Sequence, residues 1–452
     1  MARLSRVFVP AGALLLLISE ILLVAAAFVL ATYFELTVDP TVFLLYDGGF
    51  EGILLVLLCI LVGMYFRDLY SQIRVKSRVV LLQHLCMVFG FAFLMEGLIG
   101  AFAPSLRVPL RVMLSGSGIA LAAIFAWRIL FSALAPQMAG QDRLLLVGDL
   151  PSLKDVGSFI QAHPDTGLAL AGYVDDSTPP GAPLPGGQAL GPLSSLREIV
   201  RATHPRRVVV GVSDRRNQAL VNDLRKLRFE GLLIEEVAGA YETVCGRVCL
   251  RELRPSQLIY SGEFNPQPRA FFYQTLRNMV LAGIAVILSS PVLLLTALAV
   301  KLSSSGPVLW RQTRTGLDGA PFTLYRFRST RSGAEGPELT PVGRFICRLG
   351  FDRLPQLFNV LKGDMSIAGP SPERPEFVDA LTALIPYYRQ RNCVRPGITG
   401  WAQIRPGQGD APEDAGAGLE YDLYYIKHMS LALDTFIFVH TLKGILLSGG
   451  PQ

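Results

Sequence analysis

The chain has 452 residues, of which 51% are hydrophobic, and a formal net charge of +6 at pH 7. This length corresponds to about three domains, and the mean hydropathy of +0.40 is high for a soluble protein. The composition therefore argues against an ordinary soluble enzyme and directs attention to membrane segments. No nucleic-acid partner is expected.

Four nearly uncharged apolar stretches occupy the N-terminal part of the chain. They cover residues 8–33, 52–66, 79–102 and 112–134. Most of them reach the roughly 20 apolar residues that a bilayer core requires, so we predict four transmembrane helices within residues 1–136. The first stretch follows Arg3 and Arg6 and has no small-residue cleavage site before Glu35. We interpret it as a membrane anchor rather than a signal peptide.

The charges that flank these stretches predict their orientation. The loop after the first stretch carries Asp and Glu residues without any Lys or Arg, whereas the loop after the second contains Arg67, Arg74, Lys76 and Arg78. Because Lys and Arg concentrate in cytoplasmic loops, we expect the N-terminus and everything after the fourth stretch to face the cytoplasm.

Residues 141–262 have the pattern of a small α/β domain. Short apolar runs at 143–149, 167–176, 206–214 and 231–237 alternate with helical segments, and a Pro/Gly-rich loop is expected at 178–192. Alternating strands and helices favour a parallel sheet, so we predict a Rossmann-like domain in the cytoplasm with a structural or regulatory role. The six cysteines are expected to be free thiols, since Cys245 and Cys249 lack the spacing of a common zinc site.

A membrane-anchored nucleotide-sugar dehydratase is one class of protein that combines apolar helices with such a domain. It requires a GxGxxG fingerprint after the first strand and usually a YxxxK pair. Gly148 ends the first strand, but the sequence there is VGDLPSL, and no YxxxK pair is found. The dehydratase therefore stays a remote alternative.

A fifth apolar run covers residues 279–300 and has basic residues on both sides. Basic flanks at both ends suggest that both ends lie at the cytoplasmic face. Ser289, Ser290 and Pro291 occur in the middle of the run, where proline removes a helical hydrogen bond and serine hydroxyls can bond the freed carbonyls. We predict a re-entrant helix over about residues 273–301, with an ordinary fifth span as the alternative.

Residues 301–405 are strongly basic, with 15 Lys and Arg against 8 Asp and Glu. Such a surface beside a membrane suits anionic lipid headgroups or phosphorylated substrates.

Four motifs in this last part occur in a fixed order and resemble those of bacterial sugar transferases, the polyprenyl-phosphate glycosylphosphotransferases. They are SSGPVLWRQTRTGLDGAPFTLYRFRST (304–330), TPVGRFICRLGFDRLPQLFNVLKGDMSIAGPSPERPEF (340–377), RPGITGWAQI (395–404) and YDLYYIKHMSLALD (421–434). With the preceding helices and α/β domain, the chain resembles the long form of that family found in exopolysaccharide assembly, and its ending resembles the subgroup associated with PEP-CTERM protein sorting.

The resemblance implies an α/β monotopic catalytic domain over residues 265–452, seated on the re-entrant helix. The implied reaction transfers a sugar 1-phosphate from a nucleotide diphosphosugar to a polyprenyl phosphate, expected to be undecaprenyl phosphate. It takes place at the cytoplasmic face of the bacterial inner membrane, with Mg²⁺ as the cofactor, and initiates surface-glycan synthesis. A homo-oligomer paired through the α/β domains is also possible within this scheme.

Aligned on LPQL, the family's nucleophile corresponds to Asp352, which is also the expected Mg²⁺ ligand. A carboxylate nucleophile divides a transfer between two anions into two steps, while cationic groups neutralise the phosphoryl oxygens. A guanidinium fork can hold two such oxygens at once. The arginines expected to bind substrate are Arg326, Arg328, Arg344, Arg348, Arg353 and Arg395.

The chain departs from the family pattern at the chemistry itself. The family's Asp-Glu pair is Asp352-Arg353, its Gly-Pro-Arg-Pro turn has Ser371 in place of the arginine, and Glu338 stands where an arginine is common. One interpretation is a compensated active site in which Glu338 and Arg353 have exchanged charges. The alternative is a degenerate family member that acts as a membrane scaffold or binds lipid phosphate.

Overall fold

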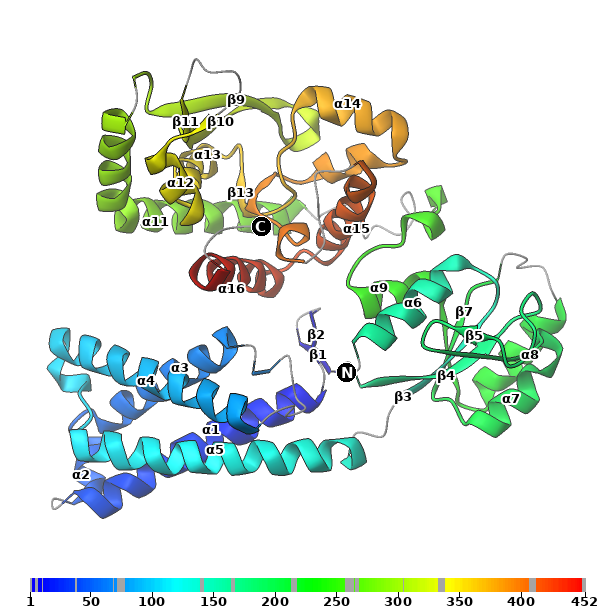
Figure 1. Ribbon diagram of the computed structural model, residues 1–452, viewed down its shortest axis with the longest axis horizontal. Coiled ribbons are helices and arrows are strands. Elements are labelled where there is room, and N and C mark those ends of the chain that lie inside the picture. The colour runs from blue at the N-terminus through cyan, green and yellow to red at the C-terminus, as the bar shows by residue number, and fades with distance from the viewer. Residues whose placement is uncertain are drawn as a thin grey trace.

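The computed structural model describes residues 2–4, 7–9, 11–36, 39–67, 69–70, 78–138, 142–163, 167–212, 218–256, 264, 268–303, 305–331, 338–405 and 412–448. Figure 1 shows three parts: a bundle of long helices, an α/β domain built on one sheet, and a third domain of short helices and strands. The chain runs through these parts in that order.

The N-terminal bundle consists of long apolar helices. A short hairpin of β1 (Ala2–Leu4) and β2 (Val7–Val9) precedes α1 (Ala11–Glu35), α2 (Pro40–Leu45), α3 (Gly49–Phe66), α4 (Arg78–Phe102) and α5 (Leu110–Met138). Phe28, Ile60 and Leu85 are among the buried side chains of its core. In the described residues of the whole chain, five helices are long and apolar enough to cross a bilayer, and four of them belong to this bundle. The chain is therefore that of a membrane protein, while the number of spans stays a prediction.

The α/β domain contains a six-stranded sheet. Its elements are β3 (Asp142–Val147), α6 (Pro151–Ala162), β4 (Leu168–Val174), β5 (Pro183–Leu184), β6 (Gly187–Gly191), α7 (Leu196–Thr203), β7 (Arg207–Val210), α8 (Gln218–Phe229), β8 (Leu233–Glu236) and α9 (Val237–Cys245). The strand order is β5-β6-β4-β3-β7-β8, and all neighbours from β6 to β8 are parallel. The predicted parallel sheet is confirmed.

Helices cover both faces of this sheet because β3 is apolar on both. Leu144 and Leu146 pack with α6 and α9, whereas Leu145 and Val147 pack with α7 and α8. The prediction of a loop at 178–192 was wrong, since that segment contains β5 and β6. Glycine and proline at its turns hid two short strands, one of which joins the sheet beside β4. Cys245 and Cys249 are buried free thiols, as expected.

The third domain begins with the long helix α11 (Pro268–Ser303) and continues through short elements. These are β9 (Leu309–Thr315), β10 (Pro321–Phe327), β11 (Thr330–Arg331), β12 (Glu338–Leu339), α12 (Pro341–Arg348), the 3-10 turn η6 (Phe351–Arg353), α13 (Gln356–Lys362), β13 (Ser366–Ala368), α14 (Pro375–Leu384), η7 (Tyr388–Cys393), β14 (Gly397–Thr399), η8 (Ala402–Ile404), α15 (Pro412–His428) and α16 (Leu431–Ser448). Strands β9 and β10 form an antiparallel hairpin, and β13 pairs in parallel with β14.

Helix α11 contains Pro291 and changes direction in Figure 1, running along the base of the third domain and then up its side. The hydroxyl of Ser290 donates to the Ile287 carbonyl at 2.8 Å. This is the carbonyl that loses its helical partner because proline has no N–H. Ala282, before the proline, packs with Leu324 of the same domain, and Val300, after it, packs with Phe327.

The α/β domain and the third domain are joined by polar contacts. Trp401 donates its indole N–H to the Gly246 carbonyl at 2.8 Å, and Lys427 pairs with Glu242 at 2.9 Å. Glu420 of α15 accepts hydrogen bonds from the Leu250 N–H at 3.2 Å and the Tyr241 hydroxyl at 3.1 Å. These contacts fix α9 and the segment after it against the third domain.

Candidate active site

Asp352 occupies a tight turn between α12 and α13. Gly350, with φ of 70°, begins the 3-10 turn in the left-handed conformation that glycine adopts without steric cost. This reversal directs Asp352 inward, where it is only 9% exposed. Gly350 is therefore required by the backbone that positions the Asp352 carboxylate.

Two guanidinium groups act on the Asp352 carboxylate. Burial raises the pKa of Asp352, and the charges of Arg353 and Arg326 oppose this shift without cancelling it. Burial also lowers the pKa of Arg326, and the like charge of Arg353 lowers it further. Arg326 comes from β10, opposite Trp310 of β9, so the hairpin and the turn bring these residues together. These three residues therefore influence one another's charges, while their roles stay predictions.

Polar groups in this neighbourhood are left without partners. The Nε of Arg326 and the Nε2 of Gln356 are buried and make no hydrogen bond among the described residues. Gln356 is 2% exposed and opens α13, four residues after Asp352. The sequence analysis did not select Gln356, although a four-residue spacing across the start of a helix places two side chains on neighbouring positions. Buried donors normally have partners, so these two indicate a place for an anion.

The other predicted arginines lie elsewhere. Arg328 is buried and donates to the Ser305 carbonyl at 2.9 Å. Arg344 and Arg348 are exposed on α12. Arg395 bonds the Thr275 hydroxyl of α11 and lies 4.7 Å from the centre of the Phe271 ring. Of the six predicted arginines, Arg326 and Arg353 are therefore the two whose charges act on the pKa of Asp352.

The turn that carries Ser371 is anchored by its neighbours. Gln403 donates to the Ser371 hydroxyl, and Arg391 donates to its carbonyl, each at 3.0 Å. Arg391 also pairs with buried Asp422 at 2.9 Å. Ser371 thus takes part in packing the turn. Glu338 lies in β12 opposite Arg331. Its side chain is outside the described part, so the charge exchange with Arg353 stays a prediction.

Glycines permit the close approach of β13 and β14. A Cβ on Gly397 would lie 2.2 Å from the Gly369 nitrogen, and one on Gly369 would lie 2.6 Å from the Arg395 carbonyl oxygen. The glycines of the GPSP and PGITG motifs are therefore needed by this strand pair. Trp401 is 4% exposed and stacks on Tyr424 with ring centres 5.6 Å apart, so it serves the domain interface.

The resemblance implies Mg²⁺ at Asp352, but the surrounding groups do not fit a divalent cation. Mg²⁺ prefers carboxylate and other oxygen ligands. The two side-chain charges that act most on Asp352 are both positive. Among the described residues, no group of three or more His, Cys, Asp or Glu side chains could hold a metal ion. The donor set around Asp352 matches an anion better than a metal.

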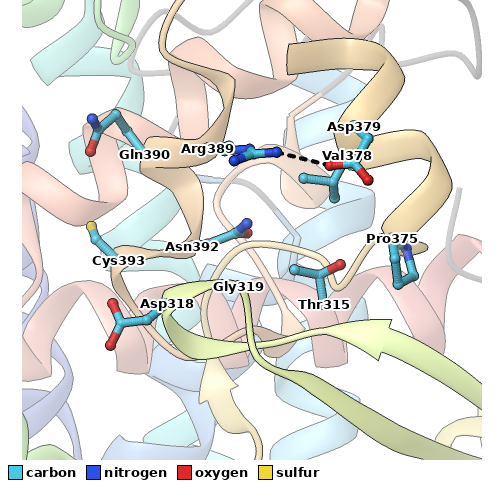
Figure 2. A pocket seen from close by; sticks show the side chains of 10 residues that line it. All are labelled: Thr315, Asp318, Gly319, Pro375, Val378, Asp379, Arg389, Gln390, Asn392 and Cys393. Carbon is cyan, nitrogen blue, oxygen red and sulfur yellow. Dashed lines mark hydrogen bonds and ion pairs between the residues drawn. The ribbon is translucent and has the colours of Figure 1, made fainter. Parts of the chain in front are cut away.

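The same domain contains a hollow of about 480 Å³, and Figure 2 shows the side chains that line it. Its lining comes from the end of β9, the following turn, α14 and η7, and includes Thr315, Asp318 and Asn392. Arg389 and Asp379 form an ion pair at 3.0 Å across its edge. Neither Asp352 nor any of the predicted arginines lines this hollow, so it is distinct from the cluster around Asp352.

Comparison with known proteins finds a family to which the third domain is similar. The model of the bacterial sugar transferase family matches residues 269–448. The exopolysaccharide production protein PSS of Rhizobium leguminosarum bv. phaseoli is 38% identical over 184 residues, which are 36% of this chain and 90% of that protein. The chain belongs to the bacterial sugar transferase family.

Longer family members match the same region. The UDP-N-acetylgalactosamine-undecaprenyl-phosphate N-acetylgalactosaminephosphotransferase of Aeromonas hydrophila is 41% identical over 221 residues, covering 47% of this chain and 52% of that protein. The UDP-glucose:undecaprenyl-phosphate glucose-1-phosphate transferase of Escherichia coli K12 is 37% identical over 231 residues, with coverages of 45% and 50%. The match thus spans about half the length of these two relatives.

Proposed function

We propose that this sugar transferase family member moves a sugar 1-phosphate from a nucleotide diphosphosugar to a polyprenyl phosphate, and so initiates synthesis of a surface glycan. The observation that carries the proposal is a buried carboxylate, Asp352, flanked by the guanidinium groups of Arg326 and Arg353 beside buried donors that lack partners. Family membership and the names of the relatives support the same reaction class.

The proposed reaction has two steps. A carboxylate oxygen of Asp352 attacks the phosphorus bonded to the sugar, and the bond from that phosphorus to the bridging oxygen of the diphosphate breaks. The nucleoside monophosphate leaves with the bonding electron pair. An oxygen of the polyprenyl phosphate then attacks the same phosphorus, the bond to Asp352 breaks, and the free carboxylate and a polyprenyl diphosphosugar result. Such covalent catalysis divides one difficult transfer between two anions into two easier steps.

We further propose the membrane arrangement that this reaction needs. The four long helices of the bundle span the bilayer, and α11 re-enters it from the side on which the third domain lies. The contact of Tyr65, near the end of α3, with His440 of α16 at 3.1 Å supports a common side for that helix end and the third domain. The basic loop after α3 makes this side the cytoplasmic one, and the lipid substrate reaches Asp352 from the adjacent leaflet.

The test is release of nucleoside monophosphate by the full-length protein in lipid nanodiscs. UDP-glucose and UDP-N-acetylgalactosamine are the first donors, because relatives carry these names, with undecaprenyl phosphate as the acceptor. We expect lipid-dependent product that carries the sugar phosphate. Asp352→Asn is expected to reduce the rate by at least about a thousandfold because it removes the nucleophile. Asp155→Asn, at a position of α6 whose side chain is 44% exposed, serves as the matched control.

Equal turnover by Asp352→Asn and the parent would refute this assignment of the nucleophile. Retention of undecaprenyl phosphate without sugar transfer, with every donor tried, would favour the lipid-phosphate-binding alternative.

A further inference from the structure

The side chains around Asp352 carry an excess of positive charge. Strand β10 packs against the turn that holds Asp352, and the charges of Arg353 and Arg326 both act on its carboxylate. With Asp352 ionised, the three side chains carry a net charge of +1. The Nε of Arg326 is buried and makes no hydrogen bond among the described residues. The net charge of these three side chains therefore suits an anion.

The two arginines repel each other in a place where burial weakens solvation. Arg326 is partly buried and has its Nε fully enclosed, and Arg353 is half-buried. Like charges held together away from water are unfavourable unless an opposite charge completes the group. A phosphoryl group fits this requirement, because its oxygens accept from guanidinium N–H groups and from the enclosed Nε2 of Gln356.

A divalent cation fits the same place poorly. It would add two positive charges to a cluster that already carries +1, and Asp352 would be its one carboxylate ligand from that cluster. Arg353 stands beside Asp352, at a position where the resemblance to the sugar transferases implies a second carboxylate. The substitution therefore exchanges a group that attracts a cation for a group that is itself a cation.

We propose that Arg353 and Arg326 supply, as fixed guanidinium charges, the positive charge that a divalent cation would otherwise bring to the transferring phosphoryl group, so that transfer at Asp352 proceeds without Mg²⁺. This inference rests on the transferase function proposed above. As the bond between Asp352 and phosphorus forms and the bond to the nucleoside monophosphate breaks, negative charge on the phosphoryl oxygens is stabilised by these two side chains. No proton needs to move in this step.

The first experiment measures nucleoside monophosphate release in nanodiscs with either 5 mM Mg²⁺ or excess EDTA, both concentrations being on the order used for such enzymes. For the parent protein we expect the two rates to agree within about threefold. Arg353→Glu restores the second carboxylate and is expected to lose on the order of a hundredfold in EDTA and to recover with Mg²⁺. Arg225→Met, which removes an exposed arginine of α8, is the control for loss of a positive charge.

A parent rate that falls about a hundredfold in EDTA and returns with Mg²⁺ would overturn this inference while leaving the transferase function intact. A failure of the proposed function has a different signature, since no donor then yields product under either condition.

The second experiment does not depend on turnover. Binding of Mn²⁺, as a paramagnetic probe, is measured by electron paramagnetic resonance for the parent, Asp352→Asn, Arg353→Glu and Arg353→Met. We expect no Mn²⁺ binding that depends on Asp352 in the parent, and a gain of such binding in Arg353→Glu. Mn²⁺ bound by the parent and lost in Asp352→Asn would contradict the inference.

The same samples also report on the anion. Inorganic pyrophosphate in EDTA is expected to raise the melting temperature of the parent and of Arg225→Met but not of Arg353→Met. An equal rise in Arg353→Met would show that the guanidinium group does not hold phosphate. Arg353→Met removes the guanidinium group but keeps an unbranched apolar stem, so this comparison remains available if Arg353→Glu fails to fold.

Discussion

The charge state of Asp352 depends on two opposing influences. Burial raises its pKa, and the neighbouring guanidinium groups of Arg353 and Arg326 restrain the rise. The folded protein therefore holds the Asp352 proton more tightly than the unfolded chain does. By linkage, the contribution of Asp352 to stability is fully present below its unfolded pKa and is lost as the pH rises through the folded pKa. At neutral pH the ionised carboxylate lowers the free energy of unfolding.

Asp352→Asn is accordingly expected to stabilise the protein while it abolishes transfer. The gain in melting temperature should be larger at pH 8 than at pH 5, because the parent carboxylate is more fully ionised at the higher pH. A gain of about 1 kcal/mol corresponds to roughly 2–4 °C for a domain of this size. Thermal unfolding of the purified protein at both pH values measures the effect, with Asp155→Asn compared in parallel. A gain that is equal or larger at pH 5 would contradict the linkage argument.

Motif spacing predicted which charged residues to examine, but not which of them meet. Asp352 and Arg353 are adjacent in sequence, and Arg326 reaches them because β10 passes beside the turn. Arg328 is two residues further along and satisfies the Ser305 carbonyl instead. Strand alternation alone would place Arg326 and Arg328 on the same face of β10. The strand ends at Phe327, between them, so Arg328 lies beyond the strand and has different neighbours. The sequence analysis did not select Gln356, because the sequence of a helical motif does not show whether a polar residue in it is buried.

At the scale of single elements, a buried ion pair joins two helices of the bundle. Arg128 of α5 contacts Glu20 of α1 at 2.7 Å and donates to the Leu69 carbonyl at 2.7 Å. Both charged side chains are almost fully buried. Ionisable residues inside a membrane bundle are stable only when they are paired. The pair therefore fixes the register of α1 against α5.

Arg128→Met is expected to lower the free energy of unfolding in detergent by about 3 kcal/mol, because it leaves Glu20 buried without its cation. Arg111→Met, at an exposed position of the same helix, should have little effect. The charge-exchanged pair Glu20→Arg with Arg128→Glu should recover part of the loss, and denaturant unfolding monitored by circular dichroism compares all four proteins. Equal destabilisation by Arg111→Met and Arg128→Met would argue against a specific role for the pair.

Periodic elements were predicted well because their patterns are local. The apolar stretches became helices, and the strands at 143–149, 167–176, 206–214 and 231–237 contain β3, β4, β7 and β8. The missed strands β5 and β6 are short, β6 begins and ends with glycine, and β6 pairs with β4 while β5 pairs with β6. Such pairing depends on tertiary context, which a single segment of sequence does not contain.

At the scale of the whole molecule, Glu420 connects two domains. It belongs to α15 but accepts hydrogen bonds from Tyr241 and the Leu250 N–H of the preceding domain, and it lies 3.4 Å from Arg247. Only 12% of its side chain is exposed, so water cannot readily replace it as the acceptor for these donors. The carboxylate thus couples the unfolding of the two domains.

Glu420→Ala is expected to reduce this coupling by about 2–5 kcal/mol, since it leaves two donors and a cation without their acceptor. Differential scanning calorimetry should then show the α/β domain unfolding in a separate transition at lower temperature. Glu230→Ala, at an exposed position of the α/β domain, is the matched control. An unchanged transition in Glu420→Ala would indicate that the apolar contacts of Trp401 and Tyr424 hold the domains together without it.

The path of α11 determines how the third domain meets the membrane. Residues before and after Pro291 pack on the same domain, through Ala282 and Val300, and a straight helix that crossed a bilayer could not return its far end to that domain. Pro291 breaks the hydrogen-bond ladder at Ile287, and Ser290 compensates for the loss. We therefore predict that both ends of α11 lie on the cytoplasmic side.

Single cysteines in a cysteine-free background test this arrangement by labelling intact cells with a membrane-impermeant maleimide. A cysteine at Tyr273 or Ser305, at either end of α11, should stay unlabelled from outside, whereas one at Asp47, between α2 and α3, should react. Pro291→Ala restores the missing N–H and favours a straight helix, so a fraction of the protein with cysteine at 305 should become reactive from outside. Labelling of that position in the parent would mean that α11 crosses the bilayer and that its packing on the third domain is lost in the membrane.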